Sequence, residues 1–182
     1  MVGMEMRVHR LQDTDSAEFA EAWRLYCRAF PLTERRDLKW HRAAMAQEAQ
    51  FVCFHVADAS GFIGLIFYWL FSQCVYVEHL AIAETRRQHG WGRRVLALAQ
   101  QHGLPVILEI EPVCDAGTAR RCAFYERCGY HRLPYKHFQL PYRCSESPLQ
   151  LELLSYPTAA DAALLAVFQR YYAAYPMRYR ET

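Results

Sequence analysis

The chain has 182 residues, of which 53% are hydrophobic, and its formal net charge is +2. A chain of this length is typical of one domain with one sizeable core. We therefore expect a single domain over residues 1–182. Because basic and acidic residues nearly balance, the composition favours a small-molecule partner and disfavours nucleic acid or an acidic membrane surface.

The seven cysteines are an odd number and include no C-x-x-C pair. This pattern argues against a disulfide framework and against a metal site, and favours reduced thiols in the cytoplasm. The segment from Met1 to Arg7 lacks an apolar targeting region. The most apolar run, Phe62 to Phe71, is about half of the roughly 20 residues that a membrane span needs. We expect a cytoplasmic protein without a membrane segment.

The first quarter of the chain predicts one strand and two helices. Asp15, followed three residues later by Glu18, is typical of a helix N-terminus. Apolar residues then recur at helical spacing as far as Pro31, which ends the helix. The expected elements are a strand at Met6–Leu11, a helix from Asp15 to Pro31, a charged loop at Leu32–Arg36 and a helix at Leu38–Ala49.

Three strands are predicted next, at residues Phe51–Asp58, Phe62–Phe71 and Gln73–Ala83. The sequence from Asp58 to Gly61 is a turn signal, so the first two strands should form a hairpin. The short connection after the second strand favours pairing with the third.

Two glycines, Gly90 and Gly92, stand between the third of these strands and a helix with apolar residues at Trp91, Val95 and Ala99. Glycine leaves no side chain between the backbone and a ligand. The free N–H groups at a helix start favour an anion. The pattern predicts a site for phosphate or pyrophosphate, although a glycine pair alone is a weak signal.

The rest of the chain predicts alternating helices and strands. A strand that follows a helical crossover can lie parallel to the strand before the glycines, which is the βαβ arrangement. The expected elements are strands at Val106–Glu111, Tyr130–Leu140 and Leu149–Leu154, and helices at Thr118–Cys128 and Ala159–Tyr172. No repeat or linker marks a domain boundary.

Three patches coincide in order and spacing, and as a set they resemble the GNAT superfamily of acyl-CoA-dependent N-acyltransferases. The resemblance covers residues 51–142 well, and Phe30-Pro31 with Glu34-Arg35-Arg36 is similar to poorly characterised bacterial members. The three patches are Glu78-x-Leu80-x-Ile82, Arg87-x-x-Gly90-x-Gly92 and Phe124-Tyr125-x-x-x-Gly129-Tyr130.

The resemblance implies an α/β fold with a curved, mostly antiparallel mixed sheet, splayed between strands 4 and 5, with helices on both faces. It implies acetyl-CoA as cofactor, with the pyrophosphate at the glycine turn and the pantetheine arm along the fourth strand. Many members carry an asparagine where this chain has Thr118, which puts one contact in doubt. The implied cofactor-binding residues are Leu80, Ala81, Ile82, Arg87, Gln88, His89, Gly90, Trp91, Gly92, Arg93, Thr118 and Phe124.

The resemblance also implies roles in acetyl transfer, which needs a neutral amine and a proton for the departing thiolate. Glu78 matches a glutamate that deprotonates the amine, and its alternative is an ion-paired glutamate. Tyr125 matches a tyrosine that acts as general acid, and its alternative is a core tyrosine.

Three other titratable residues near these positions are weaker candidates. Strand alternation places His79 on the face opposite Glu78, so we expect it to be packed under a helix. Glu109 and Glu111 share one face of their strand, and Glu111 could reach an amine. The alternative for Glu111 is an ion pair with Arg120 or Arg121.

The sequence thus predicts direct transfer of an acetyl group from acetyl-CoA to an amine of a small molecule or peptide. The alternative is a catalytically silent acyl-CoA-binding module, and the oligomeric state stays open, with a homodimer among the options. The basic segment from Tyr171 to Arg180 is expected to be a docked helix end rather than a nucleic-acid site. The expected walls of the acceptor site offer Glu34, Arg35, Arg36, Trp40, His41, Tyr135, His137 and Tyr142.

Overall fold

The computed structural model describes residues 5–181. The first four residues of the segment Met1–Arg7, for which the sequence predicted no targeting region, therefore lie outside the described part. The strands are β1 (Arg7–Arg10), β2 (Phe51–Asp58), β3 (Gly61–Leu70), β4 (Val75–Ile82), β5 (Val106–Ile110), β6 (His131–Gln139) and β7 (Leu149–Tyr156). The helices are α1 (Ala17–Ala29), η1 (Leu32–Glu34), α2 (Leu38–Gln47), η2 (Glu84–Arg86), α3 (Trp91–Gln100), α4 (Ala116–Arg127), α5 (Ala162–Ala174) and η3 (Pro176–Arg178).

The described strands form a seven-stranded sheet in the order β1-β2-β3-β4-β5-β7-β6. All neighbouring pairs are antiparallel except β4 and β5, which are parallel. The parallel pair is joined through α3, as expected for a βαβ crossover. The predicted mixed, mostly antiparallel sheet is confirmed.

The parallel pair β4–β5 is short. Its ladder runs from Val75 opposite Val106 to Val77 opposite Leu108, and no pairing between described residues continues beyond it. Both strands nevertheless extend further, β4 to Ile82 and β5 to Ile110. The sheet is therefore splayed between its fourth and fifth strands, as the family resemblance implied.

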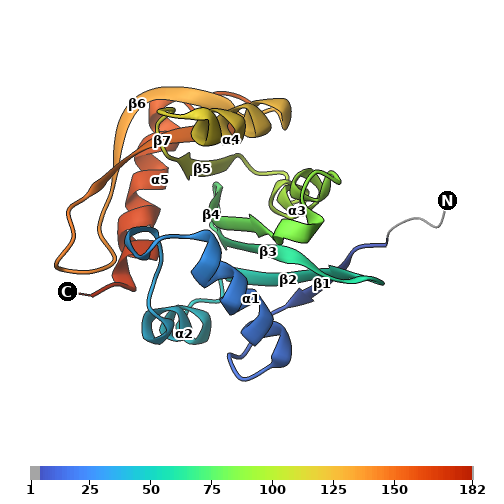
Figure 1. The fold of residues 1–182 in the computed structure, drawn as a ribbon. Helices are drawn as coiled ribbons and strands as arrows, with labels where there is room; N and C mark the ends of the chain where they lie inside the picture. Colours follow the sequence, from blue (N-terminus) through green and yellow to red (C-terminus); the bar gives the residue numbers. More distant parts are fainter. Residues whose placement is uncertain (1–4, 182) are drawn as a thin grey trace.

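The helices cover both faces of the sheet (Figure 1). Residues of α1, α2 and α5 share one buried cluster with one face of the strands. Residues of α3 and α4 share a second cluster with the other face. The predicted apolar face of α3 is confirmed, since Trp91, Val95 and Ala99 are all buried. None of the helices within residues 5–181 is long and apolar enough to cross a membrane.

The start of α1 differs from its prediction. Ser16, rather than Asp15, is the N-cap, and its side chain accepts a hydrogen bond from the backbone N–H of Phe19 at 3.2 Å. Asp13 instead binds the backbone N–H groups of Asp15 and Ser16, both at 2.9 Å. Asp15 and Ser16 are both residues that favour an N-cap. Ser16 takes this position because its hydroxyl reaches the backbone N–H of the third residue of the helix.

A β-bulge in β4 overturns the predicted orientation of His79. In the ladder with β3, Phe67 lies opposite His79 and Tyr68 opposite Val77, so Glu78 is the extra residue. An extra residue breaks the alternation of faces. The side chains of Glu78 and His79 therefore lie on the same face, with His79 Nδ1 4.0 Å from Glu78 Oε2. The expected packing of His79 under a helix is confirmed, because its ring contacts the ring of Tyr26 in α1.

The buried His41 gives a testable pH dependence of stability. Burial, with the nearby positive charge of Arg36, lowers its pKa to about 3. The folded state therefore disfavours protonation, and its stability is full above the ordinary histidine pKa of about 6.5 and falls below it. We expect His41→Phe to remove about 1.4 kcal/mol per pH unit of this slope between pH 6.5 and 4.5. Urea unfolding at several pH values measures it, and parallel curves for the two proteins would contradict it.

Candidate active site

A cleft of about 790 Å³ lies where β4 and β5 separate. Its walls come from β4 and β5, from the end of α1 and η1, from the turn between η2 and α3 with the start of α3, and from α4, β6 and β7. Segments that are far apart in the sequence therefore meet at the splay of the sheet. The splayed half-strands leave backbone groups without a strand partner, which an extended ligand could use.

The glycine turn forms one end of this cleft. Gly90 is the N-cap of α3 and has a φ of 76°, a left-handed conformation that glycine adopts readily. Gln88 also has a positive φ, of 67°. No described side chain caps the helix start. Its first N–H groups are therefore available, and their direction together with the helix dipole suits a diphosphate.

Gly92 lets α3 approach α4 closely beside the cleft. A Cβ atom at this position would meet the ring of Phe124 at 3.1 and 3.2 Å. Any side chain here would displace Phe124, which itself lines the cleft. The glycine turn thus fits the diphosphate of coenzyme A both in its donors and in the space around it.

The structure places most of the predicted cofactor residues on the cleft wall, with two exceptions. His89 is exposed, and its Nδ1 lies 2.6 Å from the carbonyl oxygen of Arg87. Thr118 belongs to a capping box with Asp115, in which its hydroxyl accepts the N–H of Asp115 at 3.0 Å. The hydroxyl of Thr118 thus belongs to a helix cap, and Thr118 does not line the cleft. The predicted residues that line the cleft are Leu80, Ala81, Ile82, Arg87, Gln88, Gly90, Trp91, Gly92, Arg93 and Phe124.

Tyr125 lines the same cleft from α4 and is 9% exposed. Its ring makes edge contacts with the rings of Phe124 and Tyr130, at centroid distances of 5.0 and 5.8 Å. Burial raises the pKa of Tyr125 to about 12. The hydroxyl therefore keeps its proton at neutral pH and can donate it.

Glu78 also borders the cleft, but its carboxylate is fully buried and its hydrogen-bonding capacity is in use. Arg36 Nη1 donates to it at 2.6 Å, Trp69 Nε1 at 2.9 Å and the Tyr142 hydroxyl at 2.7 Å. Burial alone would raise the pKa of Glu78, but Arg36, with smaller contributions from His79 and Trp69, lowers it to about 2. The ion-paired alternative considered for Glu78 is thus observed, and a carboxylate this acidic is a weak base.

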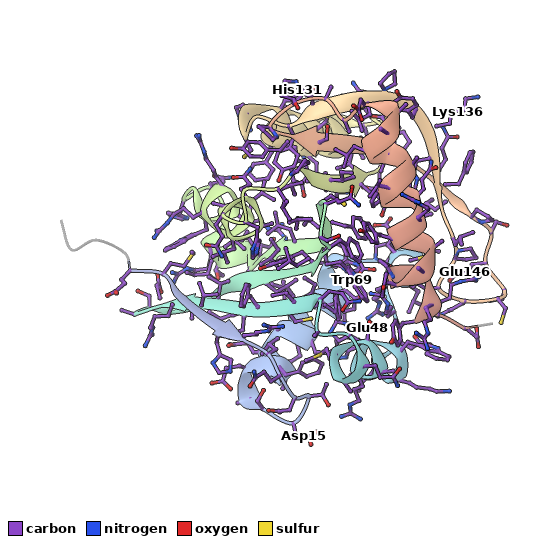
Figure 2. The ribbon with its side chains drawn as sticks, turned by 180° about the vertical axis from the view of Figure 1, so that it is seen from behind. Asp15, Glu48, Trp69, His131, Lys136 and Glu146 are labelled. Carbon is purple, nitrogen blue, oxygen red and sulfur yellow. The ribbon has the colours of Figure 1, made fainter. Side chains whose placement is uncertain are left out.

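Sequence reasoning placed Arg36 on the acceptor wall and missed its role as the partner of Glu78. Its side chain has no exposed surface. Besides Glu78, it donates to the carbonyl oxygens of Pro176 at 2.7 Å and Tyr179 at 3.1 Å. Arg36 therefore ties β4 to the C-terminal segment, which is docked as predicted. Trp69 lies in the interior beside α5 (Figure 2).

The predicted acceptor wall is mostly wrong. Of its eight residues, only Glu34 lines the cleft. His41 and Tyr142 are buried in the core, at 1% and 2% exposure. Tyr135 lies in a separate shallow depression on β6. The aromatic residues of this set were predicted to form a binding surface, whereas they pack in the interior or lie away from the cleft.

Two carboxylates at the end of β5 do line the cleft, as their shared face predicted. Glu111 forms an ion pair with Arg121, which confirms the alternative weighed for it. Glu109 accepts a hydrogen bond from the Tyr76 hydroxyl at 2.5 Å and contacts His137 Nε2. Both carboxylates therefore have polar partners within the protein.

With this geometry established, comparison with known families gives a clear result. The sequence model of the Acetyltransferase (GNAT) family matches residues 18–130, which is more than half of the chain. The chain belongs to the GNAT acetyltransferase family. The match includes β4, the glycine turn and Tyr125, whereas the cleft residues Gln139 and Leu151 lie beyond the matched region.

Two solved structures share this GNAT fold. An acetyltransferase of the GNAT family from Bacteroides thetaiotaomicron, assigned provisionally, is 26% identical, with a TM-score of 0.83 over 93% of this chain and 98% of that chain. Arabidopsis thaliana Naa50, in complex with the bisubstrate analogue CoA-Ac-MVNAL, is 15% identical, with a TM-score of 0.60 over 82% of this chain and 97% of that chain. The second likeness shows the fold alone.

A curated relative is YjbC of Bacillus subtilis (strain 168), whose name assigns it provisionally to the acetyltransferases. It is 28% identical over 100 residues, which are 54% of this chain and 50% of the relative. The match thus spans about half the length of that relative.

Proposed function

We propose that this protein is an N-acetyltransferase that transfers the acetyl group of acetyl-CoA directly to an amine. The observation that carries the proposal is that one cleft is lined by two features. The first is the start of α3 at Gly90, which no described side chain caps, and the second is the protonated side chain of Tyr125. The first feature suits a diphosphate and the second suits proton donation, and both lie at the splay of the sheet.

Acetyl-CoA, when bound, supplies the acetyl group as an activated thioester. The N–H groups at the start of α3 would hold its diphosphate, and Arg87 and Arg93 border the same end of the cleft. Arg87 is fixed by a hydrogen bond of 3.1 Å from its Nε to the carbonyl oxygen of Ile82. The open side of β4 beyond Val77 would hold the pantetheine arm. These features support the assignment.

Tyr125 is proposed as the general acid. Its hydroxyl makes no hydrogen bond with another described side chain and borders the cleft. With its pKa raised to about 12 by burial, it holds a proton that it can give to the leaving thiolate. Glu78 was predicted as the base, but its contacts favour a structural role. A structural role and a role as the base predict different results for Glu78→Gln, namely a loss of stability or a loss of turnover.

The experiment that tests the proposed function measures free coenzyme A release from acetyl-CoA with a panel of primary amines. Release that depends on both the amine and the enzyme supports the proposal. Isothermal titration calorimetry with coenzyme A separates the alternatives. Binding without release with any amine would indicate the silent binding module, and absence of binding would overturn the cofactor assignment.

A substitution at Gly90 tests the phosphate site. We expect Gly90→Val to weaken acetyl-CoA binding at least about tenfold, because a β-branched residue cannot keep the φ of 76° that aims the N–H groups. Calorimetry with coenzyme A measures the effect. Gly103→Val is the matched control, since Gly103 has a similar φ of 67° but does not line the cleft. Equal affinity losses in both variants would contradict the assignment.

A further inference from the structure

The acceptor end of the cleft lies away from the glycine turn. Its polar walls include Glu34 of η1, Glu109 and Glu111 at the end of β5, and Gln139 at the end of β6, together with Arg121 of α4, which pairs with Glu111. These residues are polar, while the neighbouring wall from Phe30 and Leu151 is apolar. Such a combination binds a short aliphatic chain with a polar end.

Glu34 is the acidic residue at this end of the cleft whose carboxylate lacks a side-chain partner among the described residues. No described side chain donates a hydrogen bond to its carboxylate or forms an ion pair with it. Burial, with repulsion from Glu111 and Glu109, raises the pKa of Glu34, and Arg121 only partly opposes the shift. Its two acidic neighbours have partners, since Glu111 pairs with Arg121 and Glu109 with Tyr76. A positive charge beside Glu34 would therefore be stabilised.

Gln139 supplies a second, independent observation. Its side chain is 4% exposed, yet its Oε1 has no hydrogen-bond partner among the described residues. A buried acceptor left without a donor is costly, so native structures nearly always satisfy it. Because Gln139 lines the cleft, a ligand N–H can supply the missing donor.

We propose that the acceptor is an aliphatic diamine, and that Glu34 and Gln139 bind the ammonium group that does not react. This inference rests on the proposed function. The reacting nitrogen has to lose its charge before acetyl transfer, whereas Glu34 favours a group that stays positive. A second ammonium meets both conditions, and it donates to Oε1 of Gln139 as well. A carboxylate in the same place would be repelled by Glu34.

The test compares three probes with the same four-carbon chain: 1,4-diaminobutane, butylamine and 4-aminobutyrate. They differ at the distal end, where the fourth carbon carries an ammonium, is a methyl or is a carboxylate, and the five-carbon homologues of the last two match the diamine in spacer length. We expect kcat/KM to be at least about tenfold higher for the diamine than for butylamine, and lowest for 4-aminobutyrate. The three- and five-carbon homologues of each probe are included. Equal use of the three probes at every length would overturn the proposal.

Variants assign the effect to the two residues. We expect Glu34→Gln to lower kcat/KM for the diamine to about the level of butylamine, so that the preference for the diamine is lost. Gln139→Leu should also lower the preference for the diamine, and it replaces Glu34→Gln in the test if that variant does not fold. Glu18→Gln is the matched control, because Glu18 lies on α1 and does not line the cleft. A diamine preference that survives in both cleft variants would overturn the assignment.

Failure of the proposed function is recognised separately. If no probe accepts an acetyl group, calorimetry measures 1,4-diaminobutane binding to the protein loaded with coenzyme A. Binding that is lost in Glu34→Gln supports the diamine site without acetyl transfer. Absence of diamine binding to the wild-type protein overturns it, even where coenzyme A binds.

Discussion

Glu78→Gln is expected to destabilise the folded protein by about 3–5 kcal/mol, because it leaves the buried charge of Arg36 without its partner. The carboxylate and the guanidinium are both fully buried and lie 2.6 Å apart. Arg36 also holds the C-terminal segment through Pro176 and Tyr179, so the loss should loosen that segment. Urea unfolding monitored by circular dichroism measures the change.

The matched control for this prediction is Glu152→Gln. Glu152 pairs with Arg132 through two hydrogen bonds of 2.9 and 3.0 Å, but the pair is partly exposed. Exposed pairs contribute at most about 1 kcal/mol, so this variant should stay close to the wild type. A Glu78→Gln protein as stable as the wild type but without turnover would instead establish Glu78 as the base.

The same ion pair predicts how stability responds to acid. The pKa of Glu78 is about 2 in the folded protein and near 4.5 when the chain is unfolded. Its contribution is therefore complete above pH 4.5 and is lost as the pH falls toward 2. That loss should be absent in Glu78→Gln, whose unfolding free energy should depend less on pH in this window.

Tyr125→Phe is expected to lower kcat about 10²- to 10⁴-fold while the affinity for coenzyme A stays the same. The substitution removes only the hydroxyl, and the ring keeps its contacts with Phe124 and Tyr130. The phosphate end of the cleft at Gly90 is untouched. Steady-state kinetics with a primary amine measures the turnover, and calorimetry measures the binding of coenzyme A.

Tyr130→Phe provides the comparison for this effect. Tyr130 is buried next to Tyr125, with ring centroids 5.8 Å apart, but it does not line the cleft. We expect its removal to leave kcat within about threefold of the wild type, because its hydroxyl cannot reach a bound thioester. Equal losses in the two variants would indicate a packing role for Tyr125, and unchanged turnover in Tyr125→Phe would exclude it as the acid.

The order of strands and helices and the cofactor end of the site follow from local sequence signals. The glycine turn depends on two residues and the helix that follows them, and its conformation is set within a few bonds. Phe124 and Tyr125 lie on one short helix, whose end at Gly129 is also a local signal. Local signals were therefore enough to predict the glycine turn and the helix that carries Tyr125, while the splay of the sheet brings the two onto one cleft.

The side-chain contacts at the proposed acceptor end depend on the tertiary structure. One extra residue in β4 turned Glu78 and His79 to the same face, and strand alternation cannot foresee a bulge. Arg36 looked like a charge in an exposed loop, yet it is buried because Glu78 and two C-terminal carbonyl groups meet there. The sequence by itself determined the elements and the cofactor turn, since those depend on neighbours along the chain. Only the tertiary structure decided which charges pair and which, like Glu34, have no side-chain partner among the described residues, because pairing depends on residues that are distant in sequence.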